Sequence, residues 1–162
     1  MKLHHWRRRL GLIRDLDAQR DRSIFAKHAD LVGLSFAQSP HDVIDLRRQL
    51  EELDAGHIGT VLKIETALGF EVLPELLLAG LEGGPLGVMI ARGDLAVEIG
   101  YARLAEVQEE ILWLCEAAHV PTIWATEVLD TLAREGRPTR AEITDAAAGV
   151  RAECVMLNKG PE

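Results

Sequence analysis

The sequence has no long apolar run, only two cysteines, and fewer basic than acidic side chains. No stretch approaches the roughly 18 uncharged apolar residues that a membrane-spanning helix requires, so we expect no membrane insertion. Two cysteines in 162 residues do not suggest a disulfide framework and predict a reducing, cytoplasmic environment. The formal net charge of −8 argues against non-specific binding of nucleic acid, which needs a basic surface.

The first 23 residues are the local exception to this acidic balance. Five basic residues precede the first acidic residue, Asp15: Lys2, Arg7, Arg8, Arg9 and Arg14. The segment lacks the apolar core and the small-residue cleavage site of a secretory signal. We interpret residues 1–23 as a solvated basic arm and helix, with binding of an anion or partner as the alternative. Residues 24–162 are assigned to one domain.

From residue 30 onward, short apolar runs alternate with helical patterns. The predicted strands are Asp30–Phe36, Gly59–Thr66, Val88–Ala91, Pro121–Trp124 and Glu153–Leu157. The predicted helices cover 40–53, 69–81, 101–119 and 127–133, and a capping-box pattern at Thr139–Glu142 indicates one more. Five strands separated by helices predict an α/β fold, with parallel strands joined by right-handed crossovers.

Charged residues gather at the C-terminal ends of these strands, which is typical of a TIM-barrel type of fold, whose chemistry lies at that face. A complete barrel has eight strands in about 250 residues. The sequence therefore predicts a partial barrel of five parallel (βα) units, with an open sheet as the alternative. We expect it to be completed by another segment or to form a homo-oligomer.

Lys63 and Glu65 end the predicted strand Gly59–Thr66. Side chains alternate along a strand, so these two project from one face. Charged groups at the end of an apolar strand need a partner, a metal ion or a ligand. This pattern allows two interpretations: an ion pair between Lys63 and Glu65, or a site where they bind a ligand.

Gly93 and Asp94 follow the next strand, where we expect a tight turn. Glycine allows a ligand to approach the backbone closely. Because Asp94 lies one βα unit after Glu65, the two carboxylates should converge, and together they make a plausible Mg²⁺ site. A plain helix N-cap is the alternative for Asp94. Thr126 ends the following strand, where its hydroxyl could meet a substrate or cap the next helix.

These strand ends, in this order, resemble the pyruvate kinase family. The matching motifs are DLVGLSF at 30–36, KIE at 63–65, ARGDL at 91–95, AT at 125–126 and RPTRAE at 137–142. The resemblance covers roughly residues 24–157. It implies the barrel of that family and phosphoryl transfer between phosphoenolpyruvate (or pyruvate) and ADP (or ATP) in glycolysis.

The resemblance also implies roles for single residues. Glu65 and Asp94 would hold Mg²⁺ or Mn²⁺, and Lys63 would stabilise the charge that develops on the enolate and phosphoryl oxygens. Gly93, Asp94 and Thr126 would bind the substrate carboxylate, and Thr126 would lie near the protonated carbon. Lys63 and Thr126 are therefore the candidate catalytic residues.

The sequence departs from the family pattern in several places. Counterparts of the family's first three strands are missing, and with them the K⁺ ligands and a phosphate-contacting arginine, so we expect an incomplete site. Gln38 stands where an arginine is usual and Glu127 where glutamine is common. The tail 156–162 replaces a Ser-Gly-Glu pattern. These changes suggest a divergent branch.

Two other functions remain open on the sequence. One is a metal-dependent aldolase or lyase that acts on a pyruvate enolate, although Arg92-Gly93 before Asp94 favours the kinase-like interpretation. The other is a non-catalytic barrel fragment that acts by association, since open sheet edges are normally covered. In the latter case Leu31, Val155 or Leu157 would lie near the seam.

Overall fold

The structure, a computed structural model, describes residues 28–157. In this range five strands form a single sheet in the order β1-β2-β3-β4-β5, and every neighbouring pair is parallel. The strands are β1 (Leu31–Leu34), β2 (Gly59–Ile64), β3 (Leu86–Ala91), β4 (Thr122–Val128) and β5 (Cys154–Leu157). The predicted α/β fold, a partial barrel of parallel (βα) units, is confirmed.

Helices connect each strand to the next. They are α4 (Pro40–Glu52), α5 (Ala67–Glu71), α6 (Leu73–Glu82), α7 (Arg92–Ile99), α8 (Tyr101–Ala117), α9 (Asp130–Glu135) and α10 (Arg140–Ala148), followed by the short 3₁₀ helix η2 (Gly149–Arg151). Within the described range none of these helices is both long and apolar enough to cross a bilayer. Residues 1–23, assigned to the basic arm, lie outside the described residues.

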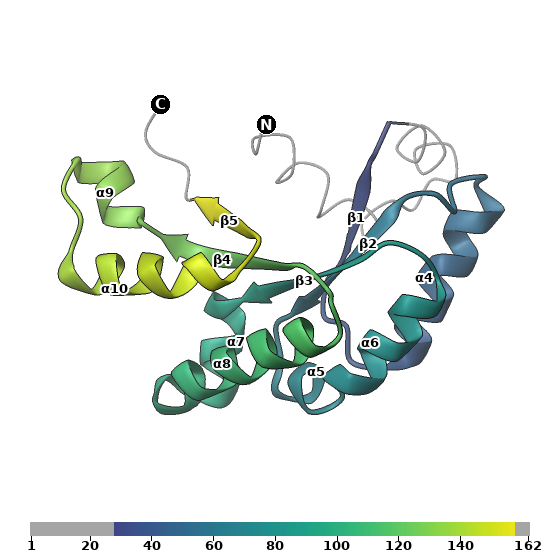
Figure 1. Ribbon diagram of the computed structural model, residues 1–162, viewed down its shortest axis with the longest axis horizontal. Helices are drawn as coiled ribbons and strands as arrows, with labels where there is room; N and C mark the ends of the chain where they lie inside the picture. Colours follow the sequence, from purple (N-terminus) through teal and green to yellow (C-terminus); the bar gives the residue numbers. More distant parts are fainter. Residues whose placement is uncertain (1–27, 158–162) are drawn as a thin grey trace.

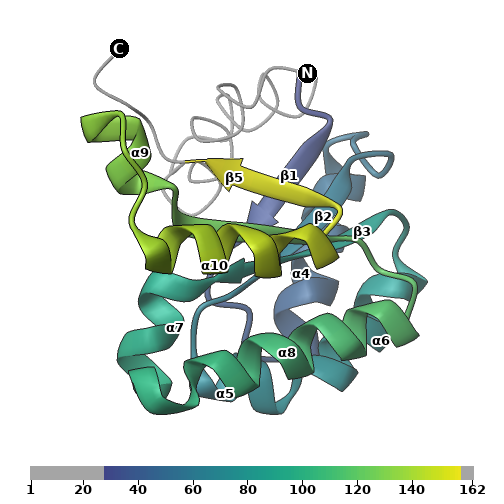
Figure 2. The ribbon, with the colours of Figure 1, turned by 60° about the vertical axis from the view of Figure 1, so that its left-hand side comes forward.

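Helices α4 to α8 cover one face of the sheet, while α10 lies beside β4 and β5 (Figures 1 and 2). Alternate strand residues point toward these helices. The main core cluster contains Leu62 and Ile64 from β2, Val88 and Ile90 from β3, and Trp124 from β4. All five are essentially inaccessible to solvent. Because strand side chains alternate, the residues between these core positions lie on the opposite face of the sheet.

The opposite face carries a smaller apolar cluster made by Val61, Met89, Ile123 and Ala125, one strand position away from the core residues. Because strand side chains alternate, Lys63 belongs to the same face as Val61. In a closed barrel this would be the interior. The polar ends of β2, β3 and β4 therefore emerge at one edge of the sheet.

Helix starts were predicted well where a capping side chain is present. Ser39 caps α4 with Pro40 in the first turn, and Thr139 and Glu142 form the predicted capping box of α10. The single helix predicted over 69–81 is wrong. Two helices occur there, and the second begins at Leu73, with a proline in its first turn. Proline lacks an N–H and therefore suits a new helix start better than a helix interior.

Two other expectations at strand ends are wrong. The region after β3 is the helix α7, not a tight turn. The helix predicted over 127–133 begins only at Asp130, because Glu127 and Val128 still belong to β4. Thr126 and Glu127 there have φ of 73° and 54°. Such angles are uncommon without glycine, and nothing in the composition of this segment indicates them.

Arg47 joins α4 to the N-terminal edge of the sheet. Its guanidinium donates from Nη1 to Ile58 O at 2.9 Å and from Nη2 to Pro85 O at 2.8 Å. The side chain is buried, and burial lowers the pKa of Arg47. The two carbonyls precede β2 and β3, so one side chain ties a helix to the starts of two strands.

Arg47→Ala should lower the free energy of unfolding by about 1–3 kcal/mol, because it removes the donor to the buried Ile58 carbonyl and one of the two donors to the Pro85 carbonyl, which also accepts from Thr60 N. Urea denaturation followed by circular dichroism measures this change. Arg48→Ala is the matched control, since Arg48 is exposed and, among the described residues, forms ion pairs with Asp45 and Glu52 on the same helix and no others. That control should change stability by less than about 0.5 kcal/mol. Equal effects of both substitutions would contradict the role given to Arg47.

Glu153 ties the start of β4 to β5. The backbone N–H and the hydroxyl of Thr122 donate to Glu153 Oε2 at 2.6 Å and 3.1 Å. The hydrogen bond from the Thr122 backbone lowers the pKa of Glu153 below its usual value. The ionised carboxylate is therefore the form that the folded state prefers.

A lowered pKa in the folded state means that Glu153 contributes stability above its unfolded pKa of about 4.3, and that this contribution is lost as the pH falls through the folded value. We expect Glu153→Gln to be less stable than the wild type at neutral pH. The difference should shrink below about pH 4. Unfolding free energies measured against pH test this expectation, with Glu116→Gln on the exposed surface of α8 as control. A difference that is independent of pH would contradict it.

Candidate active site at the strand ends

The end of β2 carries a lysine and a glutamate that pair with each other. Lys63 Nζ lies 2.6 Å from Glu65 Oε1. Lys63 Nζ also donates to Ser35 Oγ at 3.0 Å, and the backbone N–H of Phe36 donates to Glu65 Oε2 at 2.6 Å. Ser35 and Phe36 directly follow β1. These contacts therefore join the ends of two neighbouring strands.

Burial makes this pair energetically important. The Glu65 side chain is 3% exposed and that of Lys63 is 20% exposed. A buried carboxylate needs a counter-charge and hydrogen bonds to remain ionised. Each Glu65 oxygen has one such partner. The ion pair that the sequence left open as a structural role is present, and binding of a ligand by the same residues stays a prediction.

Gly93 and Asp94 lie in the first turn of α7, and Ala91 is the N-cap residue, so Asp94 is not the N-cap. Among residues 28–157 no side chain caps this helix. The N–H groups of a first helical turn lack partners within the helix, and the helix dipole places partial positive charge there. The start of α7 therefore offers hydrogen-bond donors to an anion.

Glu65 and Asp94 come from adjacent strand ends. Ile64 is in register with Ile90, so Glu65 stands next to Ala91, and Asp94 follows in the first turn of α7. Asp94 is exposed, and its side chain makes no hydrogen bond or ion pair with any residue in the range 28–157. The sheet thus places both carboxylates at the same edge, and their sharing of one ion stays a prediction.

Thr126 comes from the end of β4 and covers Gly93. A Cβ placed on Gly93 would lie 2.8 Å from Thr126 Cγ2 and 3.9 Å from its Oγ1. No larger residue fits at position 93 unless Thr126 moves. Thr126 does not cap α9, whose N-cap is Leu129. Gly93 and Thr126, two of the residues predicted to bind substrate, are therefore in contact. The third, Asp94, directly follows Gly93 in the chain.

The donor atoms at this edge suit a hard divalent cation. Mg²⁺ in proteins commonly takes one or two carboxylates and completes its shell with water and substrate. Glu65 and Asp94 supply two carboxylates, and each Glu65 oxygen keeps a lone pair beyond the hydrogen bond it accepts. The described part of the chain has no cluster of three or more metal-binding side chains. An ion here would thus depend on substrate or water ligands.

Several contacts of the site leave little or no signal in the sequence. The roles of Ser35 and of the Phe36 N–H could not be inferred, because they depend on the register between β1 and β2. Arg92 was noted only as part of a motif, yet it reaches β4 and α10. Its position one residue before Gly93 is the only sequence signal that could have pointed to it.

Two departures from the family pattern can be located. Gln38 Nε2 donates to Thr66 Oγ1 at 3.1 Å, and that oxygen also accepts from Gly69 N to cap α5. Gln38 therefore docks the loop after β1 onto the end of β2. Glu127 is exposed at the site edge and adds a carboxylate there. The tail from Asn158 onward lies outside the described residues.

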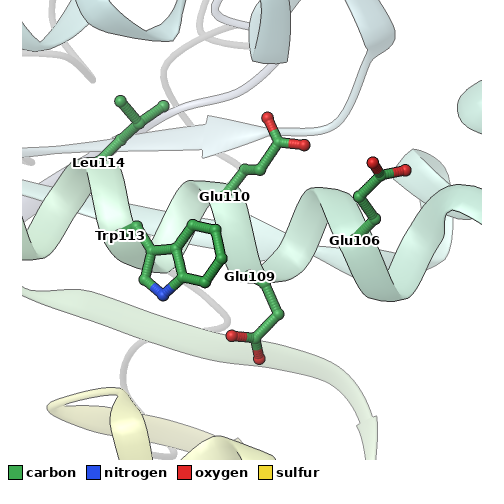
Figure 3. Close-up of a pocket in the computed structure, with 5 residues that line it drawn as sticks. All are labelled: Glu106, Glu109, Glu110, Trp113 and Leu114. Atoms are coloured by element: carbon green, nitrogen blue, oxygen red, sulfur yellow. The ribbon is translucent and has the colours of Figure 1, made fainter.

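Two surface hollows in the described part of the chain lie away from these strand ends. One is on a single helix, α8, and is lined by Glu106, Glu109, Glu110, Trp113 and Leu114 (Figure 3). Another, on α10, is lined by Arg140, Ala141, Ile143 and Thr144. Neither contains a predicted site residue. The candidate site itself is made by the ends of strands β2 and β4 and by the start of α7.

Residues 10–160 match the family model for the barrel domain of pyruvate kinase. The chain belongs to the pyruvate kinase family. The resemblance seen in the strand-end motifs is thereby confirmed, and the five parallel strands are part of a pyruvate kinase barrel domain.

Curated pyruvate kinases support the same assignment. The chain is 39% identical to the enzyme of Bacillus licheniformis over 131 residues, which is 80% of this chain and 22% of that protein. It is 37% identical to the enzyme of Lactobacillus delbrueckii subsp. bulgaricus over 76% of this chain and 20% of the relative. It is 36% identical to the enzyme of Clostridium acetobutylicum over 80% of this chain and 27% of that protein. The chain thus spans about a fifth to a quarter of the length of these relatives.

Lys63→Met should lower the free energy of unfolding by about 3 kcal/mol, because it leaves the buried carboxylate of Glu65 without its counter-charge. Urea denaturation at neutral pH measures this change. Asp94→Asn serves as control, since Asp94 is exposed, and should stay within about 0.5 kcal/mol of the wild type. A stable Lys63→Met protein would show that the pair contributes little to the fold.

Proposed function

We propose that this chain supplies the cation-binding and enolpyruvate-binding part of a pyruvate kinase site, for phosphoryl transfer between phosphoenolpyruvate and ADP. The observation that carries the proposal is the arrangement at one sheet edge. The buried Lys63–Glu65 pair ends β2, and the uncapped start of α7 with Asp94 follows β3. Thr126 from β4 packs over Gly93. This combination offers an ammonium, two carboxylates and backbone donors to one anionic substrate.

Each group has a separate chemical task in this proposal. Glu65 and Asp94 would hold Mg²⁺ or Mn²⁺, which would supply positive charge to the enolate and phosphoryl oxygens when bound. Lys63 stabilises the negative charge on those oxygens in the transition state. The N–H groups of Gly93 and Asp94, with the Thr126 hydroxyl, bind the substrate carboxylate. Thr126 also lies near the carbon that is protonated.

The proposal includes partners for this chain. The described sheet has three strands fewer than an eight-stranded barrel, and its edges are β1 and β5. Leu31 and Val155 on these edges are partly buried, whereas Leu157 is 55% exposed. We propose that further strands, from another segment or another copy, complete the barrel and supply the nucleotide and K⁺ contacts. A cytoplasmic enzyme of glycolysis is the setting that fits this reaction.

Calorimetry with Mn²⁺ and oxalate, a mimic of the enolate, tests the binding part of the proposal. The full chain should bind Mn²⁺ and then oxalate weakly, with little pyruvate formed from phosphoenolpyruvate and ADP. Glu65→Gln and Asp94→Asn should each abolish the metal-dependent binding, because each removes a charged ligand of the ion. Asp45→Asn on the exposed surface of α4 is the control and should bind like the wild type.

The outcome that contradicts the proposal is a folded wild-type chain that shows no metal-dependent binding of oxalate. Equal binding by Glu65→Gln would also contradict it, because the ion would then lie elsewhere. Release of pyruvate from a 4-hydroxy-2-oxo acid would favour the aldolase alternative instead. Association without any binding of oxalate would favour the non-catalytic fragment.

A further inference from the structure

The end of β4 has a strained backbone at the residue that is proposed to touch the substrate. Thr126 has φ 73° and Glu127 has φ 54°. Positive φ is a clear outlier for a β-branched residue such as threonine. Residues in such conformations cost roughly 1–3 kcal/mol each and persist only where surrounding contacts enforce them. The ladder between β4 and β5 is also irregular between Trp124 and Val128.

Arg92 makes the contacts that can enforce this conformation. Its Nε donates to Ala125 O at 2.7 Å and its Nη2 donates to Thr126 O at 2.6 Å. Both carbonyls are thereby held in the plane of one guanidinium group. Hydrogen bonds from a charged donor are shorter and stronger than neutral ones. The peptide on each side of the Thr126 Cα is therefore connected to the same rigid side chain.

The guanidinium itself is fixed from two further directions. Nη1 is paired with the carboxylate of Asp145 on α10. The group also lies over the ring of Trp124, with Cζ 4.5 Å from the ring centroid. Arg92 is only 9% exposed. Its donors thus face protein atoms, and it is poorly placed to contact a substrate phosphate directly.

Arg92 also belongs to the other half of the proposed carboxylate site. It is the first residue of α7 and directly precedes Gly93, whose Cα is covered by Thr126. One residue therefore connects the helix start that offers backbone donors with the strand end that offers the hydroxyl. A shift of Arg92 would change the spacing between these two groups.

We propose that Arg92 is a positioning residue that fixes Thr126 in its strained conformation and sets its distance from the Gly93–Asp94 backbone, so that the two together bind a small carboxylate. This inference rests on the proposed function. Lysine cannot replace Arg92, because a single ammonium lacks the planar fork that reaches two carbonyls and a carboxylate at once. Asp145 assists by orienting the guanidinium from α10.

The test compares the full chain with Arg92→Lys, Asp145→Asn and a control, Arg103→Met. Arg103 is exposed on α8, and within residues 28–157 its one ion pair is with Glu106 on the same helix. Arg92→Lys should weaken the binding of oxalate to the Mn²⁺-loaded chain by about tenfold or more, since a misplaced binding group loses its geometry. Its affinity for Mn²⁺ alone should change far less, because Glu65 and Asp94 are intact. Asp145→Asn should show a smaller loss of the same kind, and Arg103→Met none.

A second readout does not depend on the proposed function. The ¹³Cα and ¹³Cβ chemical shifts of Thr126 report its backbone angles, and we expect them to leave the positive-φ range in Arg92→Lys but not in Arg103→Met. If Arg92→Lys fails to fold, Asp145→Asn replaces it, because it removes the charge that orients the guanidinium from α10. We then expect the Thr126 chemical shifts to move part of the way out of the positive-φ range, and unchanged Thr126 shifts in Asp145→Asn overturn the inference.

The possible results separate the two proposals. If the folded wild type binds no oxalate, the proposed function fails, and the Thr126 shifts alone decide the role of Arg92. A folded Arg92→Lys chain that keeps the Thr126 shifts overturns the inference. So does unchanged oxalate affinity in Arg92→Lys when the wild type binds oxalate. Equal loss of Mn²⁺ and oxalate binding would show a general structural role instead and would also overturn it.

Discussion

All neighbouring strands of the sheet run parallel, and this constraint decides where polar chemistry can occur. Strand side chains alternate between a helix-covered core and an apolar opposite face, so charged groups find room only where the strands end. Parallel strands all end at the same edge. Residues that are far apart in the sequence, such as Glu65 and Thr126, therefore come to one edge without any long-range recognition between them.

Two separate polar networks lie on either side of β3 at that edge. One joins β1 to β2 through Lys63 and Glu65, and it balances a buried negative charge with an ammonium and an N–H. The other joins β3 to β4 and α10 through Arg92, whose positive charge is balanced by Asp145 and two carbonyls. Each network is satisfied within itself. Between them, Gly93 and Asp94 lie in the first turn of α7, which no side chain among residues 28–157 caps, so their N–H groups can serve as donors.

The sequence predicted the parts that depend on local patterns. Periodicity predicted five strands and their parallel pairing, and the caps at Ser39 and Thr139 predicted two helix starts, because these signals come from residues close in the chain. The alternation at Lys63 and Glu65 predicted their common face. The helix at 92–99 was missed, since Gly93 suggested a turn and no capping side chain precedes it. The contacts of Arg92 with Thr126 and Asp145 span 34 and 53 residues and leave no local pattern.

The irregular stretch of β4 between Trp124 and Val128 has an implication for how this chain can change over time. A regular ladder with β5 would relieve the unfavourable angles at Thr126 and Glu127, so the fold alone would gain from straightening this strand. Straightening would also move the threonine hydroxyl away from the helix start. Under the proposed function, selection for stability and selection for binding of the substrate carboxylate therefore oppose each other at this point. On that basis, a variant that is more heat-resistant because of changes at 125–127 would bind the carboxylate less tightly.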